Sequence, residues 1–171
     1  QCTDHRVNQV TQKLFNKYLS PLDFAYCDVS QLAKDVHSCG YHNQKAQNIQ
    51  SSSITIVEEY GGEVPDKLED LVKLPGVGRK TANCVLGEIY DVPSMVIDTH
   101  MLRIMNLLKF VSTKDPKKIE FDLMKLFDEN VWVKLTHMII DHGREVCIAR
   151  RPNCNECVIV PYCPSAQINN Y

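Results

Sequence analysis

The chain has 171 residues, of which 44% are hydrophobic and 23% are charged, a composition typical of a globular protein with one domain or two small ones. It contains no apolar run of about 18 residues and no signal-peptide pattern, so we expect neither a membrane span nor secretion. The formal net charge of -2 is not the basic balance typical of nucleic-acid-binding proteins, and it counts mildly against that class.

Helical periodicity dominates the first part of the chain. The stretch "TDHRVNQVTQKLFNKYLS" has apolar residues at helical spacing, with Thr3 or Asp4 as its N-cap and Pro21 beyond its end. Helices are also predicted in "VSQLAKDVHSCG", which Gly40 closes, and in "NQKAQNIQSSSITIVEEYGG" and "PDKLEDLVKL".

The second part of the chain continues the helical pattern. A turn at "PGVG" precedes a helix that runs to about Ile89, and another helix follows from Thr99 to about Leu108. Two more are predicted, in "DPKKIEFDLMKLFDEN" and from about Val131 to Val146. Only "SMVI" is strand-like, and it is too short to form a sheet. The sequence therefore predicts an all-α fold.

Four of the eight cysteines are grouped near the end of the chain, with the spacing Cys147-x6-Cys154-x2-Cys157-x5-Cys163. The other four are scattered, which favours a reducing compartment and a metal site over a disulfide framework. Structural zinc usually uses two close cysteine pairs, and only one is present here. Four thiolates in a compact loop also suit a four-iron four-sulfur cluster, which the spacing favours modestly. Disulfides are the third possibility.

The turn before Lys80 presents chemistry of its own. Its glycines permit tight backbone geometry, and the unpartnered N–H groups at a helix start can bind a phosphate oxygen. The alternative is a simple packing joint between two helices. The helix dipole opposes a cation at Lys80, and a partly desolvated, neutral amine there is a nucleophile able to form a Schiff base. The alternative is a solvated surface lysine. Asp98 precedes the next helix, where it is either a plain N-cap or also a catalytic anion.

The cysteine spacing, "LPGVGRKTAN" and "IDTH" together resemble the endonuclease III family of helix-hairpin-helix DNA glycosylases, over nearly the whole chain. This resemblance implies a six-helix-type domain at residues 1–110, with the helix-hairpin-helix motif at about 66–90. It implies a cluster domain at residues 111–171, whose loop at 147–163 holds a four-iron four-sulfur cluster. The family has further helical sequence ahead of the glutamine that corresponds to Gln1, so we expect this chain to lack an N-terminal helix.

The resemblance also implies a role for individual residues. Lys80 attacks C1′ of a damaged nucleotide, and Asp98 assists it and stabilises positive charge on the sugar. Gln1 enters the space that the flipped base leaves, and Tyr41 wedges into the opposite strand. Two groups complete the predicted site: the DNA-backbone contacts Gly76, Val77, Gly78, Arg79, Arg150 and Arg151, and the cluster ligands Cys147, Cys154, Cys157 and Cys163.

The predicted function is therefore a bifunctional DNA glycosylase and AP lyase of base excision repair, which removes oxidised pyrimidines from damaged duplex DNA. We expect a monomer, located in the cytoplasm and nucleoid of a bacterium or archaeon, or in the nucleus or mitochondrion of a eukaryote. One alternative is a mismatch-specific monofunctional glycosylase, which Lys80 disfavours because such relatives usually carry another residue there. The other is a non-catalytic iron–sulfur module that binds DNA or senses redox state.

Overall fold

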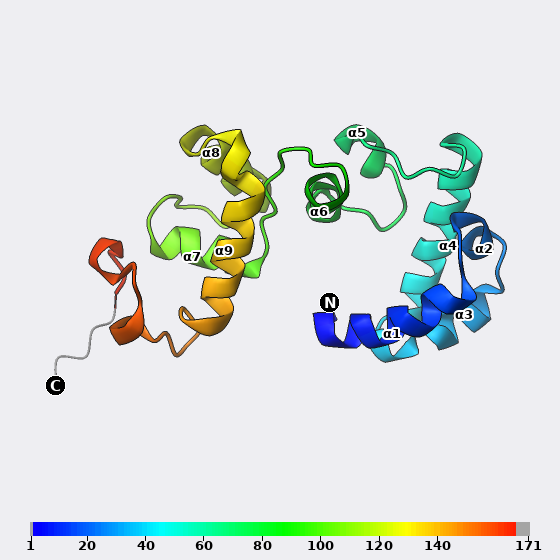
Figure 1. The fold of residues 1–171 in the computed structure, drawn as a ribbon, viewed down its shortest axis with the longest axis horizontal. Coiled ribbons are helices and arrows are strands. Elements are labelled where there is room, and N and C mark those ends of the chain that lie inside the picture. The colour runs from blue at the N-terminus through cyan, green and yellow to red at the C-terminus, as the bar shows by residue number, and fades with distance from the viewer. Residues whose placement is uncertain (1, 167–171) are drawn as a thin grey trace. The chain divides into compact units, whose positions relative to one another are not determined.

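The computed structural model describes residues 2–166, and the regular secondary structure in that range consists of helices without a β-strand (Figure 1). The all-α fold class is thereby confirmed. The chain folds into two compact units, Gln1–Arg79 and Lys80–Tyr171, called here the first and second unit. The domain division predicted near residue 110 stays a prediction. None of the helices in the described range has the length and apolar character needed to cross a membrane.

The described residues of the first unit form five α-helices and one short 3-10 turn. Their bounds are α1 Asp4–Lys17, α2 Pro21–Ala25, α3 Val29–Asp35, the turn His37–Cys39, α4 His42–Glu59 and α5 Leu68–Leu71. Helix α1 starts as predicted, because the Thr3 hydroxyl accepts a hydrogen bond from the Arg6 N–H. The core is formed by Leu14, Tyr18, Leu32, Ala33, Val36 and Ala46.

Two helices of the first unit differ from the sequence prediction. Helix α2 was not predicted, although Ser20 and Asp23 form a capping box around Pro21, which occupies the first helical turn. Helix α5 has only four residues, shorter than the predicted segment. It ends close to Pro75, and a residue that precedes a proline is disfavoured in helical geometry.

The second unit contains α6 Arg79–Ile89, whose first residue ends the first unit, followed by α7 Thr99–Leu107, α8 Pro116–Leu126 and α9 Trp132–Glu145. Short 3-10 turns lie at Glu129–Val131, Cys154–Glu156 and Val160–Tyr162. The segment "SMVI" is not a strand: it is part of an extended connector between α6 and α7. Its Met95 and Ile97 belong to the core, together with Met101, Ile104, Met105, Val111, Ile119, Leu123 and Ile139.

A glycine sets the close packing of α7 and α9. A Cβ atom built at Gly143 would collide with the ring of His100 and approach the Ile104 side chain to 3.0 Å. Any larger residue would therefore push α9 away from the helix that Asp98 begins. Residues on both sides of position 110 share the same core in this unit.

A carboxylate ties α1 to α3 in the first unit. Asp35 accepts hydrogen bonds from Lys17 Nζ at 2.6 Å, Tyr18 Oη at 2.9 Å and Gln31 Nε2 at 2.9 Å. Burial raises the pKa of this carboxyl group, but the bonds from Lys17, Gln31 and Tyr18 outweigh burial, and its pKa lies below the ordinary value.

We expect Asp35→Asn to lower the free energy of unfolding of the chain by about 1 kcal/mol at pH 7, because Lys17 is largely exposed and the ion pair is screened. Since the pKa of Asp35 is lower in the folded state, its contribution is complete above about pH 5 and is lost as the pH falls through about 4 and below. Urea unfolding at both ends of this pH range measures the effect.

The matched control is Asp122→Asn, which removes an exposed pair with Lys125 at 3.5 Å and should change stability by less than about 0.5 kcal/mol. If Asp35→Asn unfolds with the same pH dependence as the unchanged chain, the Asp35 carboxylate does not contribute as described.

Candidate functional site

The turn between α5 and α6 is held in place by α4. Gly76 has a φ of 79°, in the left-handed region, and the Val77 N–H donates to the Leu74 carbonyl at 3.0 Å. The Ser52 hydroxyl donates to the Pro75 carbonyl at 2.6 Å. A Cβ atom at Gly76 would meet the Asn48 side chain at 2.6 Å. Glycine is therefore required here both by the backbone conformation and by the close approach of α4.

The other glycine of the turn faces open space. Gly78 is exposed, and a Cβ atom there would have no neighbour within 4 Å. Helix α6 starts at the next residue, and the first N–H groups of a helix have no intrahelical acceptors. An accessible helix start with small residues in front of it is a suitable place for a phosphate group.

The two predicted catalytic side chains both belong to the second unit and lie at the starts of successive helices. Lys80 is the second residue of α6 and is exposed, so of the two environments considered for its amine the described residues provide the solvated one. Asp98 is half-buried and caps α7, because its Oδ1 accepts from the Met101 N–H at 2.8 Å. The capping bond holds the Asp98 carboxylate in a fixed orientation.

His100, two residues after Asp98, packs against Gly143 with its Nδ1 atom buried. Within the described residues this nitrogen has no hydrogen-bond partner. His100 thus contributes mainly to the packing of α7 against α9.

Tyr41 is an exposed aromatic residue with unusual backbone angles. It adopts left-handed backbone angles (φ 46°, ψ 33°) directly before α4, and 70% of its surface is accessible. Such angles are uncommon for a residue other than glycine and are found at functional sites more often than elsewhere. Gln1, the other predicted base-gap residue, lies outside the described residues.

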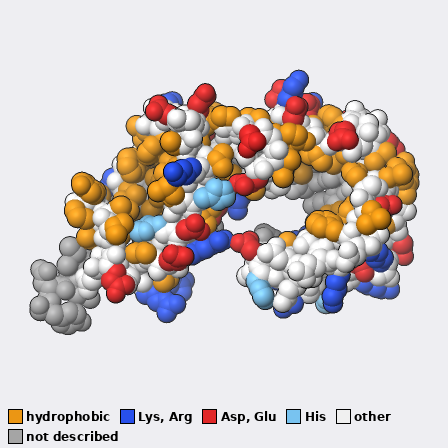
Figure 2. All heavy atoms as spheres, viewed as in Figure 1, with side chains coloured by type: hydrophobic (Ala, Val, Ile, Leu, Met, Phe, Trp, Pro, Cys, Tyr) orange, Lys and Arg blue, Asp and Glu red, His pale blue; other side chains and the backbone are white. Residues whose placement is uncertain are grey.

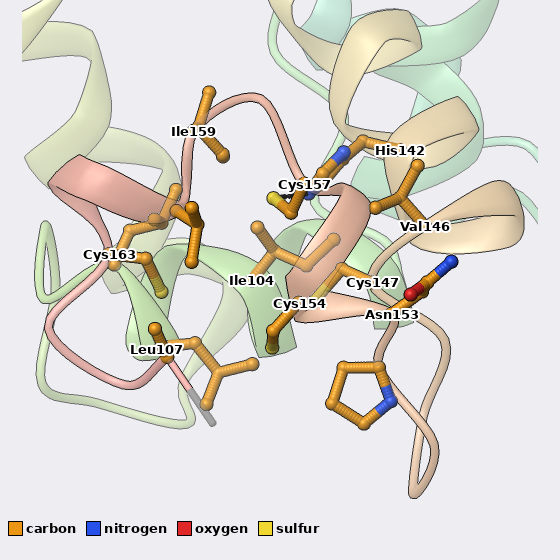
Figure 3. A pocket seen from close by; sticks show the side chains of 14 residues that line it. Ile104, Leu107, His142, Val146, Cys147, Asn153, Cys154, Cys157, Ile159 and Cys163 are labelled. Carbon is orange, nitrogen blue, oxygen red and sulfur yellow. Dashed lines mark hydrogen bonds between the residues drawn. The ribbon is translucent and has the colours of Figure 1, made fainter. Parts of the chain in front are cut away.

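The four clustered cysteines line one cavity, together with His142 of α9 and apolar residues of α7 and of the cysteine loop. Figure 3 shows Cys147, Cys154, Cys157 and Cys163 around this space, with Ile104 from α7 among them. The loop that carries the cysteines has little regular structure beyond its two 3-10 turns. It is tied back to α7 by the Ser165 hydroxyl, which donates to the Leu107 carbonyl at 2.8 Å.

Basic side chains border the cysteines. Arg103 donates to the Cys147 carbonyl at 2.6 Å and lies 3.4 Å from its Sγ atom. His142 lines the cavity, 3.8 Å from the Cys157 Sγ atom, and burial, followed by the charge of Arg103, lowers the pKa of its ring. Arg150 and Arg151 are exposed on the loop, and Arg150 has a φ of 69°.

The arrangement of the thiols bears on which metal group they fit. Zinc–sulfur bonds of about 2.3 Å bring four ligands close to a single point. Among residues 2–166, no three histidine, cysteine, aspartate or glutamate side chains converge in this way. Four thiols around one cavity are a donor set used both by structural zinc and by four-iron four-sulfur clusters, and the cysteine spacing favours the cluster.

Sequence reasoning missed two buried polar residues of the second unit, Asn83 and Glu120, which are 4% and 5% exposed. Asn83 donates to the Glu120 carboxylate at 3.0 Å and to the Met95 carbonyl at 3.0 Å. The available signal was the position of Asn83, next to buried Ala82 and one turn before buried Leu86. A polar residue on the apolar face of a helix calls for a partner.

Comparison with known proteins first identifies the broad class to which the protein belongs. Residues 1–129 match the family model of the HhH-GPD superfamily base excision DNA repair proteins. The fold is also that of a solved trapped endonuclease III–DNA covalent intermediate, with a TM-score of 0.92 and 39% sequence identity over 96% of this chain and 78% of that one.

The particular family follows from the sequence relatives. Endonuclease III of Synechocystis sp. is 46% identical over 98% of this chain, and that of Bacillus subtilis is 42% identical over the same share. In both cases the match covers 77% of the relative. The chain belongs to the endonuclease III family.

We expect Gly76→Ala to destabilise the first unit by about 1 to 3 kcal/mol, because the new methyl group meets Asn48 and the backbone angles disfavour alanine. Gly78→Ala is the matched control, since its methyl group enters open space and its φ is not in the left-handed region; it should cost less than about 1 kcal/mol. Urea unfolding of the three proteins compares them. Equal losses for the two variants would mean that α4 does not brace the turn.

Proposed function

We propose that Lys80 is the nucleophile and Asp98 the supporting anion of a bifunctional DNA glycosylase and AP lyase that removes oxidised pyrimidines from duplex DNA. The activity follows from membership of the endonuclease III family. The observation that carries the assignment to these two residues is their placement: each begins a helix of the same compact unit, and Asp98 is fixed by its capping bond.

The reaction begins with the neutral amine of Lys80. Its nitrogen attacks C1′ of the damaged nucleotide, and the bond from C1′ to the base breaks, so that the base departs with the electron pair and is protonated. Opening of the sugar ring then gives a Schiff base between Lys80 and C1′. Loss of a proton from C2′ expels the 3′-phosphate with the electrons of the C3′–O bond. The strand is thereby cut without any external oxidant or reductant.

Asp98 acts through charge. Positive charge develops on the sugar as the base departs, and a carboxylate held rigidly nearby stabilises it without reorganising. The amine of Lys80 must be neutral in order to react. Because this amine is exposed, a bound duplex that covers it would displace water and so disfavour its charged form.

The chain is proposed to bind the duplex through backbone N–H groups in addition to basic side chains. The N–H groups around Gly76, Val77, Gly78 and Arg79 are proposed to bind phosphate oxygens, a contact that needs no net positive charge. The face shown in Figure 2 accordingly mixes acidic and basic side chains. Tyr41 is proposed to enter the opposite strand, and Arg150 and Arg151 to contact phosphates.

Cys147, Cys154, Cys157 and Cys163 are proposed to hold a four-iron four-sulfur cluster. The four thiols line one cavity, and this donor set is one that such clusters use. When bound, the cluster supplies cross-links between distant points of the loop and allows redox chemistry. Arg150 and Arg151 lie between two of the ligands, so an ordered loop presents them on a fixed backbone.

The proposed substrate places the enzyme with the genome: in the nucleoid if the chain is bacterial or archaeal, and in the nucleus or mitochondrion if it is eukaryotic. The two relatives compared here are bacterial proteins.

Borohydride trapping tests the two catalytic assignments. A duplex with one thymine glycol and a duplex with one abasic site should both yield a covalent complex, and Lys80→Gln should abolish it because the amide forms no imine. Asp98→Asn retains the cap, since asparagine caps helices equally well, but removes the charge. It should lower the single-turnover rate by about 100-fold or more while the protein stays folded.

Trapping that persists in Lys80→Gln would remove Lys80 from the mechanism. Trapping on the abasic duplex alone would leave a lyase with a different lesion preference. No trapping by a folded protein that contains its cluster would favour a monofunctional glycosylase or a DNA-binding module.

Metal analysis tests the cluster independently of activity. We expect about four iron atoms per chain and a broad absorbance band at about 400 nm, both lost in Cys157→Ser. Cys84→Ser is the matched control, because Cys84 is exposed on α6 outside the cysteine loop. A protein that carries zinc and lacks the band would contradict the cluster assignment.

A further inference from the structure

We propose that Asn83 is a positioning residue, whose buried amide holds the chain segment that leads into Asp98 against the helix that carries Lys80. The inference rests on the proposed roles of Lys80 and Asp98, and it adds the hydrogen-bonded contact that sets their relative position.

The amide of Asn83 joins three parts of the second unit. Its Nδ2 atom donates to the Met95 carbonyl at 3.0 Å and to the Glu120 Oε1 atom at 3.0 Å, so both amide protons are used. The backbone carbonyl of Asn83 accepts from the Ser94 hydroxyl at 2.7 Å. Helix α6, the connector and α8 thus meet at one buried side chain.

The register of these contacts relates them to the proposed catalytic pair. Lys80 and Asn83 are three residues apart on α6 and lie on the same side of the helix. Met95 precedes Asp98 by the same number of residues. The hydrogen bond from Asn83 to Met95 therefore connects two residues that are each three positions away from a proposed catalytic residue.

The connector depends on such bonds because it has no regular structure of its own. Residues 91–98 form neither helix nor strand, so their buried backbone groups need other partners. Besides the bonds at Met95 and Ser94, the Val96 N–H donates to the Thr136 hydroxyl of α9 at 3.4 Å. The hydrogen bond from Asn83 to the connector is shorter than the one that involves Thr136, and Asn83 is closer in sequence to Lys80 than Thr136 is.

Asparagine suits this position better than its near equivalents. Leucine of similar size offers no donor and would leave the Met95 carbonyl and the Glu120 carboxylate with one bond fewer in a buried site. Aspartate has the same shape, but its two carboxylate oxygens are acceptors. They would face the Met95 carbonyl and the Glu120 carboxylate, which are acceptors as well. Glutamine adds a methylene group to a site that is 4% exposed.

The experiment compares Asn83→Ala, Asn83→Asp and the double variant Asn83→Asp/Glu120→Gln with the unchanged protein. In the double variant, the amide introduced by Glu120→Gln donates to the carboxylate introduced by Asn83→Asp, which restores the link between α6 and α8 with reversed polarity. The bond to the Met95 carbonyl remains absent. Ile119→Val, at a fully buried position of the same core, is the control for loss of stability alone.

Three quantities are measured: the melting temperature, the single-turnover rates of base excision and of abasic-strand cleavage, and the dissociation constant for a duplex with an uncleavable abasic analogue. We expect about 10- to 100-fold slower rates in Asn83→Ala, equal for both reactions because both use Lys80, with DNA affinity changed less than about threefold. Ile119→Val should keep its rates within about twofold.

The double variant shows whether Asn83 positions the connector or only stabilises the fold. It does so even if the single variants do not fold. We expect it to regain most of the melting temperature while its rates stay about 10-fold low or lower. Recovery of both properties would overturn the inference, because the Met95 bond would then be dispensable. If Lys80→Gln still traps DNA, the proposed function itself fails. If Lys80→Gln is inactive but the Asn83 variants react at the normal rate, only this inference fails.

Discussion

The connector between α6 and α7 is the constraint on which the second unit depends. It must bring Asp98 to the start of a helix, yet it forms no helix or strand that would fix it by backbone bonds alone. The Met95 and Ile97 side chains anchor it in the core. Asn83 and Thr136 bond to its Met95 carbonyl and Val96 N–H, and its own Ser94 hydroxyl donates to the Asn83 carbonyl of α6. A buried polar network of this kind specifies one arrangement, because every alternative leaves a group without a partner.

The two units divide the tasks of the enzyme. The first carries the hairpin turn and Tyr41, and both show left-handed backbone angles, at Gly76 and at Tyr41. The hairpin turn is also bonded to α4 through Ser52. The second carries Lys80, Asp98 and the cysteines, whose features are side-chain chemistry. The recognition through backbone N–H groups proposed above would need no net positive charge, so a net charge of -2 is compatible with membership of a family of DNA repair proteins, a class against which the charge had counted.

The cysteine loop illustrates how a short segment obtains a fixed shape without a core of its own. Its two 3-10 turns are too short to bury an apolar face, and it is held to the rest of the unit by contacts from α7 and α9. Arg103 reaches the Cys147 carbonyl and Ser165 reaches the Leu107 carbonyl, one near each end of the loop. Thiolate–metal bonds would add the internal links that the loop lacks.

The sequence by itself determined the helices with strong periodicity and clear caps, the turn before Lys80, the N-cap at Asp98 and the grouping of the four cysteines. Each of these depends on residues close together in the chain: Thr3 with Arg6, Asp98 with Met101, and glycines within one turn. The tertiary structure alone decided the rest. The short length of α5, the exposure of Lys80, the fit of Asn48 beneath Gly76 and the bond from Asn83 to Met95 and Glu120 join residues distant in sequence or depend on the surroundings. Local patterns contain no information about which distant group fills a given space.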